Sequence, residues 1–132
     1  MRDPQSSSVA LQDYVDSVQT PSGPRLHLST DGVTDPGQLP ESVEDAAYRI
    51  VTESLTNVLR HAHADSASVS LWIDDNKLQM KITDNGVLQT PWTEGIGLSS
   101  MRKRATTLGG SISAGPARSG GEVRVTLPLA AS

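Results

Sequence analysis

The chain lacks three features that would settle its class at once. Its 132 residues include no cysteine, which excludes disulfides, thiolate zinc sites and cysteine nucleophiles. No apolar run approaches the ~20 residues of a membrane span, and Met1-Arg2-Asp3-Pro4 does not begin a signal peptide. Basic residues do not predominate, and the net charge of −4 argues against a nucleic-acid binder. We therefore expect a soluble cytoplasmic domain with no nucleic-acid partner and no direct membrane contact.

Hydrophobic periodicity predicts an α+β fold. Residues 1–8 are polar and expected to be disordered, and residues 9–132 fit one domain. Ser42 is the expected N-cap of the longest helix, and residues 115–121 are expected to form a loop. The arrangement that suits this pattern is a sheet with its helices on one face. Helices are expected at 9–18, 42–61 and 98–108, and strands at 25–30, 67–73, 78–84, 112–114 and 123–127.

The longest expected helix carries polar residues where its buried face should be apolar. On a wheel of about 100° per residue, Asn57 falls beside Ile50 inside a wide apolar arc. Glu53 lies at the edge of this arc, one turn from Asn57, and His61 is close by. Because an unsatisfied buried amide costs about 1–3 kcal/mol, Asn57 should have a partner. A ligand or metal ion is one candidate, and a neighbouring loop is the other.

Another polar residue ends the strand expected at 78–84. Asp84 keeps phase with Leu78 and Ile82, and a buried carboxylate is costly unless it is paired or hydrogen-bonded. Fixed there, it can accept a hydrogen bond from an exocyclic amino group such as that of adenine. Gly86 would let a flat ring approach the backbone. The alternative is an ordinary Asp-Asn-Gly turn.

Glycines lead into the third expected helix. Gly95-Ile96-Gly97-Leu98 would expose backbone N–H groups at the helix N-terminus, where the helix dipole favours an anion such as phosphate. The alternative is a flexible loop followed by a cap. The basic residues that follow are candidates for phosphate contacts or for a solvated helix face. They are Arg102, Lys103 and Arg104.

In their order along the chain, these features resemble the ATP-binding domain (Bergerat fold) shared by gyrase, the ninety-kilodalton chaperone, MutL and sensor histidine kinases, and the kinases most closely. Glu53-x-x-x-Asn57-x-x-Arg60-His61-Ala62 is similar to their N box. Asp84-x-Gly86 and Gly95-x-Gly97-Leu98 are similar to their two glycine boxes. The run from Gly97 to Gly110 is similar to the subgroup of nitrate and desaturase sensors. The resemblance covers about residues 40–128.

The resemblance implies a two-layer α/β sandwich with a mixed sheet, in which ATP lies between the helices and a lid at residues 87–96. Asn57 would ligate the Mg²⁺ that bridges the phosphates, and Glu53 would help to order that ion and its water. Asp84 would bind the adenine amino group. The other implied nucleotide contacts are Arg60, His61, Gly86, Gly95, Ile96, Gly97, Leu98 and Thr126.

The chain departs from the family pattern at two places. Leu88 stands where the first glycine box normally has a further glycine, which would stiffen the lid or weaken nucleotide contact. Many relatives have a threonine after the glycines of the last hairpin, where it helps to hold adenine. Glu122 stands there in this chain and offers no hydroxyl, although Thr126 lies further along the strand.

The implied function is transfer of the γ-phosphate of ATP to a histidine on a separate dimerisation domain of the same kinase. His27, His61 and His63 all lack the sequence context of such an acceptor. The phosphate would then pass to a response regulator, which in this subgroup is usually of the LuxR type. Two alternatives are a regulatory binding module, such as an anti-sigma factor of the same superfamily, and a pseudokinase that binds nucleotide without transferring phosphate.

Overall fold

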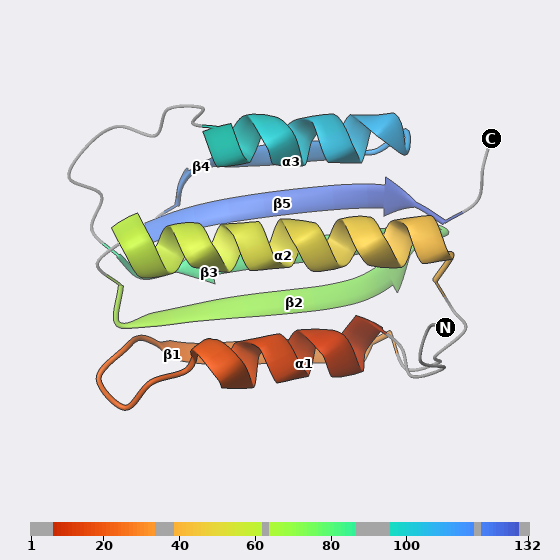
Figure 1. The fold of residues 1–132 in the computed structure, drawn as a ribbon. Helices are drawn as coiled ribbons and strands as arrows, with labels where there is room; N and C mark the ends of the chain where they lie inside the picture. Colours follow the sequence, from red (N-terminus) through yellow and green to blue (C-terminus); the bar gives the residue numbers. More distant parts are fainter. Residues whose placement is uncertain (1–6, 34–38, 62–63, 87–95, 118–119, 130–132) are drawn as a thin grey trace.

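A computed structural model of the chain describes residues 7–33, 39–61, 64–86, 96–117 and 120–129 (Figure 1). Three helices in these ranges cover one face of a five-stranded sheet. None of these helices is long and apolar enough to cross a membrane. The helices are α1 (Ser7–Val18), α2 (Glu41–His61) and α3 (Ile96–Thr107), and the strands are β1 (Arg25–Gly32), β2 (Ser66–Asp74), β3 (Lys77–Asp84), β4 (Ser111–Ala117) and β5 (Gly120–Pro128).

The sheet is mixed, in the order β1-β2-β3-β5-β4. β1 pairs with β2 in parallel, and the other neighbours pair antiparallel. β2 and β3 are joined through Asp75 and Asn76, whose φ angles are 54° and 56°. Two positive φ angles are typical of the type I′ turn, which suits the twist of a hairpin. The predicted α+β architecture, with its helices on one face, is confirmed.

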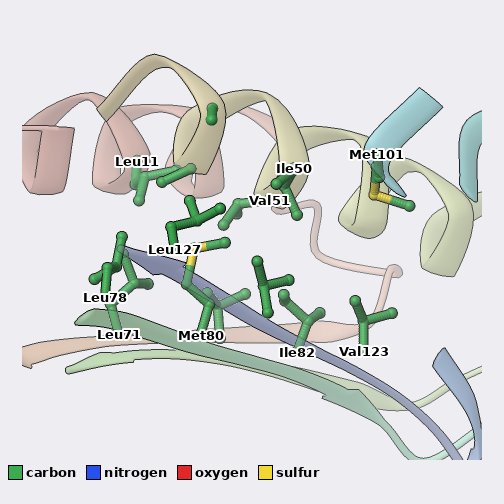
Figure 2. Close-up of a cluster of buried hydrophobic side chains, with 14 of the residues drawn as sticks. Leu11, Ile50, Val51, Leu71, Leu78, Met80, Ile82, Met101, Val123 and Leu127 are labelled. Atoms are coloured by element: carbon green, nitrogen blue, oxygen red, sulfur yellow. The ribbon is translucent and has the colours of Figure 1, made fainter. Parts of the chain in front are cut away.

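The core lies between the sheet and the helices (Figure 2). Alternate residues of β2, β3 and β5 are buried because successive side chains of a strand point to opposite faces. Ile50 and Val51 of α2 are fully buried above them, and α1 and α3 add Leu11 and Met101 at either side. The apolar arc predicted for the long helix is confirmed by these contacts.

Two helix starts differ from the prediction. α1 begins at Ser7, so Ser7 and Ser8 are helical rather than disordered; a serine is well tolerated at a helix start, where backbone N–H groups lack intrahelical partners. α2 begins at Glu41, and the Glu44 N–H donates to the Pro40 carbonyl oxygen at 2.9 Å. Because that carbonyl accepts the first helical bond, Pro40 takes the N-cap position predicted for Ser42.

The last hairpin is longer than predicted. Within the expected loop 115–121, residues 115–117 and 120–121 continue the β4–β5 ladder, in which Gly115 faces Glu122 and Ala117 faces Gly120. Glycine and proline misled the prediction, but proline is compatible with an edge strand, and β4 lies at the edge of this sheet. The longer β5 brings Gly120 and Gly121 back to the end of β3.

α3 ends where the Gly-Gly pair predicted. Gly109 has a φ of 80° and the Gly110 N–H donates to the Ala105 carbonyl oxygen at 2.9 Å, which is a common way for glycine to terminate a helix. The helix begins at Ile96, two residues earlier than expected, and ends at Thr107. Ile96 and Gly97 therefore belong to its first turn.

Candidate functional site

Most of the predicted site residues come together at one end of the sandwich, at the left of Figure 1. α2 ends there and α3 begins there. Because β3 runs antiparallel to both β2 and β5, the C-terminal end of β3 lies beside the N-terminal ends of those two strands. The end of α2, the end of β3, the start of α3 and the start of β5 are thus gathered at one end of the fold.

Asp84 is the buried carboxylate of this edge. Its side chain is 7% exposed and faces the helix layer in phase with Leu78 and Ile82, as predicted. Its Oδ1 accepts hydrogen bonds from the Gly86 N–H at 2.8 Å and the Gly121 N–H at 3.4 Å. Backbone donors offset part of the desolvation cost of such a carboxylate.

The hydrogen bond from the Gly86 N–H to the Asp84 carboxylate closes an Asx-type turn. This is the ordinary Asp-Asn-Gly turn that the sequence analysis gave as the alternative to a binding role. The turn and the binding role are compatible. Among the described residues, the hydrogen bonds to the Asp84 carboxylate all end on Oδ1. The turn therefore holds the carboxylate through Oδ1 and leaves Oδ2 without a hydrogen bond in the described part of the chain.

The Gly120-Gly121 pair is a part of this site that the sequence interpretation missed. A Cβ on Gly120 would collide with the carbonyl oxygen of Asp84, and its φ of 154° is rare for residues with side chains. Gly121 supplies one of the two N–H groups on the Asp84 carboxylate. The available signal was the glycine pair itself, since glycine within a strand marks a close approach of another backbone.

Glu53 and Asn57 lie one turn apart on α2, so their side chains share a face of the helix. Glu53 Oε2 is buried and has no hydrogen-bond partner among the described residues. Asn57 is half-buried and makes no side-chain hydrogen bond to any residue in the described ranges. Residues 62–63, which follow α2, and most of the expected lid lie outside the described residues, so the alternative in which a neighbouring loop satisfies the amide stays a prediction.

An oxygen-preferring cation fits these two side chains. One buried carboxylate oxygen without a donor and one amide oxygen form a small set of hard ligands, which suits Mg²⁺ because that ion usually retains several waters. The described ranges contain no cluster of three or more His, Cys, Asp or Glu side chains that could hold a metal. A metal at this place would thus depend on few protein ligands.

The remaining predicted contacts are placed by their backbone. Arg60 and His61 form the last residues of α2. Ile96, Gly97 and Leu98 form the first turn of α3, whose N–H groups have no intrahelical partners. The expected lid at 87–96 lies outside the described residues, Leu88 and Gly95 included, except for Ile96, which begins α3.

A buried contact joins the two helices that carry these groups. The Ser54 hydroxyl of α2 donates to the Met101 sulfur of α3 at 3.3 Å. Ser54 is the neighbour of Glu53, so the contact fixes α3 against the part of α2 that faces the site.

Further along α3, Lys103 is exposed, as a solvated face predicts, whereas Arg102 and Arg104 are partly buried.

Thr126 is the predicted contact that the structure does not bring to this site. It alternates with the buried Val125 and Leu127, so its side chain lies on the sheet face away from the helices. There its hydroxyl hydrogen-bonds the Gln79 Oε1 at 2.8 Å. Its partner in the ladder is Gln79, five positions before Asp84 on β3.

A hollow of about 320 Å³ on this outer face is lined in part by Trp72, Gln79, Arg124 and Thr126, and is separate from Asp84.

Comparison with known families and structures agrees with this geometry. Residues 42–131 match the model of the family described as histidine kinase-, DNA gyrase B-, and HSP90-like ATPase. This range includes α2, Asp84, the start of α3 and the last hairpin.

Curated relatives of the chain are sensor kinases. It is 36% identical over 121 residues to the sensor histidine kinase YxjM of Bacillus subtilis, which covers 91% of this chain and 30% of that protein. It is 33% identical over 96 residues to the histidine-protein kinase/phosphatase UhpB of Salmonella typhimurium, covering 71% and 19%. The chain thus spans less than a third of the length of these relatives.

A solved structure shares the fold. The histidine kinase domain of the blue-light activated histidine kinase from Erythrobacter litoralis EL346 superposes with a TM-score of 0.71 at 19% identity. The superposition covers 98% of this chain and 65% of that domain. It confirms the sandwich architecture independently of the motifs.

Proposed function

Because the chain belongs to the family of histidine kinase-, DNA gyrase B- and HSP90-like ATPases, we propose that it is the ATP-binding catalytic domain of a sensor histidine kinase. The observation that carries the proposal is the position of Asp84, a buried carboxylate whose Oδ1 is held by backbone N–H groups at the edge where α2 ends and α3 begins. The sensor-kinase relatives favour this function over a regulatory binding module.

At the purine end, Asp84 Oδ2 accepts a hydrogen bond from the exocyclic amino group of adenine. A fixed carboxylate discriminates well between a donor and an acceptor at that position, since the wrong group leaves a buried charge unsatisfied. Gly86 is buried beside the carboxylate and has no side chain to obstruct the ring. This end of the site selects the base.

At the phosphate end, Asn57 would ligate Mg²⁺ and Glu53 would help to order the ion and its water. Bound there, the ion would neutralise charge on the β- and γ-phosphates, which is the main demand of phosphoryl transfer. Arg60 and His61 lie at the end of the same helix. The N–H groups at the start of α3, around Gly97, face the same edge and favour an anion.

The reaction is transfer of the γ-phosphoryl group to a neutral imidazole. The bond between the γ-phosphorus and the bridging oxygen of ADP breaks as a phosphorus–nitrogen bond forms, and the second imidazole nitrogen releases its proton. His27 lies in β1 and His61 at the end of α2, and neither is followed by Asp or Glu, as an acceptor on a dimerising helix would be. We assign the acceptor to a separate dimerisation domain of the same kinase.

The wider partners follow from the same assignment. A histidine-bound phosphoryl group is passed to a response regulator, and the motif run from Gly97 to Gly110 favours one of the LuxR type. Because ATP and the regulator are both cytoplasmic, the domain belongs on the cytoplasmic side of the cell. Phosphotransfer from the assembled kinase to a panel of purified regulators would identify the partner; a preference for regulators outside the LuxR class would contradict the subgroup.

Titration of the chain with ATP and ADP, with and without Mg²⁺, tests the proposal. We expect both nucleotides to bind and Mg²⁺ to strengthen binding. Asn57→Ala should remove the effect of Mg²⁺, with a loss of about 10–100-fold in nucleotide affinity in its presence. Calorimetry measures the affinities, and Asn76→Ala in the β2–β3 turn is a control remote from the site. An unchanged Mg²⁺ effect in Asn57→Ala would defeat the metal-ligand assignment.

Transfer is tested by adding a dimerisation domain and [γ-³²P]ATP. Labelled histidine supports the kinase, whereas nucleotide binding without label would favour the pseudokinase. If neither nucleotide binds, the whole assignment fails.

A further inference from the structure

Asn85 stands between Asp84 and Gly86 at a position where the motif accepts any residue, and its side chain connects two strands. Its Oδ1 accepts hydrogen bonds from the Asp65 N–H at 2.8 Å and the Ser66 N–H at 2.9 Å. Its own N–H donates to the Ser66 carbonyl oxygen at 3.2 Å. Three hydrogen bonds therefore join the chain just beyond β3 to the start of β2.

These bonds continue the strand pairing beyond the last ladder pair, Ala67 with Asp84. A side-chain oxygen takes the place of a backbone carbonyl and satisfies two adjacent N–H groups. The anchor it reaches is itself fixed, because the Asp65 carbonyl oxygen accepts from the Arg25 N–H of β1 at 2.9 Å. Asn85 thus ties the end of β3 to a junction of two strands.

The residue that carries the carboxylate is held from the opposite side by β5. There Gly121 donates to Asp84 Oδ1, and Gly120 approaches the Asp84 carbonyl oxygen too closely for any side chain. With Asn85 bonded to β2, the Asp84–Gly86 turn is clamped between two strands. Removal of either clamp would let the carboxylate shift, and a displacement of about 1 Å can cost about 100-fold in a function that depends on alignment.

We propose that Asn85 is a positioning residue that fixes the Asp84 carboxylate for discrimination between purine bases. This rests on the proposed function, in which Asp84 Oδ2 accepts from the adenine amino group. Within the described residues only Oδ1 of Asn85 takes part in side-chain hydrogen bonds, and it acts as an acceptor. The role therefore requires an acceptor at this position and does not require the amide donor.

The acceptor requirement provides a matched pair of variants. Asn85→Asp keeps an oxygen that accepts from both N–H groups, and Asn85→Ala removes it. Calorimetric titration with ADP and with IDP, which has a carbonyl oxygen in place of the amino group, measures base discrimination. We expect Asn85→Ala to bind ADP about tenfold more weakly, equivalent to ~1.4 kcal/mol, and to lose most of the preference for ADP over IDP. Asn85→Asp should stay close to the unmodified chain in both.

One control variant and one replacement variant separate a positioning role of Asn85 from a general effect on stability. Tyr14→Phe removes hydroxyl contacts to Thr52 and Thr56 on the α1 side of α2, so it should lower the unfolding temperature and leave the ADP-to-IDP ratio unchanged. If Asn85→Ala does not fold, Asn85→Gln repeats the test, because it keeps the amide and displaces the acceptor by one methylene.

An unchanged ADP-to-IDP ratio in Asn85→Ala, or an equal loss in Asn85→Asp, would overturn the inference and leave the proposed function standing. If the unmodified chain itself shows no preference for ADP, the assignment of Asp84 fails, and this inference fails with it. The three results are distinguishable within one set of titrations.

Discussion

On the sheet face that the helices cover, Asp84 ends a row of buried apolar side chains and is bonded only to backbone N–H groups in the described part of the chain. On the opposite face, polar side chains bond to one another across the strands: Thr126 to Gln79, and Glu122 to Lys81. Polar residues are expected on the outer face, since water and neighbouring side chains satisfy their hydrogen-bonding groups. A carboxylate on the inner face opposes the packing because its burial costs desolvation free energy, and this is the reason for the binding role that we propose for Asp84.

The largest expected effect comes from Asp84→Asn, which directly tests this difference. The amide can still accept from Gly86 through its oxygen, but it then presents a donor where the carboxylate presented Oδ2. We expect ADP affinity to fall by about 100-fold because two donors would face each other. IDP, which offers an acceptor, should bind at least as well as before. Calorimetry with both nucleotides measures this, and equal losses for ADP and IDP would show that Asp84 does not contact the base.

A smaller effect is expected from Gly120→Ala, which disturbs the support of Asp84 from β5. The new Cβ would collide with the Asp84 carbonyl oxygen at an unfavourable φ, so the free energy of unfolding should fall by about 1–3 kcal/mol. Urea denaturation provides the measurement. Gly115→Ala is the matched control: its Cβ would have open space, and its effect should stay within about 0.5 kcal/mol. Equal effects would contradict the close approach of β5 to β3.

Much of the fold could be predicted from the sequence because it depends on local patterns. Period-two alternation in 67–73 and 78–84 located two strands, and the apolar arc of 42–61 located α2. Asp84 was identifiable because its phase on β3 conflicts with its charge. Such signals require only the residue and its near neighbours, so tertiary structure is not needed to detect them.

The features that the sequence interpretation missed depend on contacts between distant segments. Residues 115–121 were expected to form a loop, since their glycines and proline are typical of turns, and only the pairing of β4 with β5 makes 115–117 and 120–121 strand. The bonds from Asn85 to Asp65 and Ser66 span about 20 positions and leave no periodic pattern. Family resemblance identified Asp84 and Gly86 but treated the residue between them as free to vary.

The smallest expected effect comes from Thr126→Val, and it tests the correction that the structure makes to the sequence interpretation. If Thr126 contacts the nucleotide, removal of its hydroxyl should lower the affinity for ADP. As an outer-face residue bonded to Gln79, it should cost only about 0.5–1.5 kcal/mol of unfolding free energy and leave ADP affinity unchanged. Valine keeps the shape of the side chain and suits a strand, so the hydroxyl alone is tested. Urea denaturation and ADP titration of the same protein separate the two outcomes. A weaker affinity for ADP would show that Thr126 contributes to nucleotide binding despite its position on the face away from Asp84.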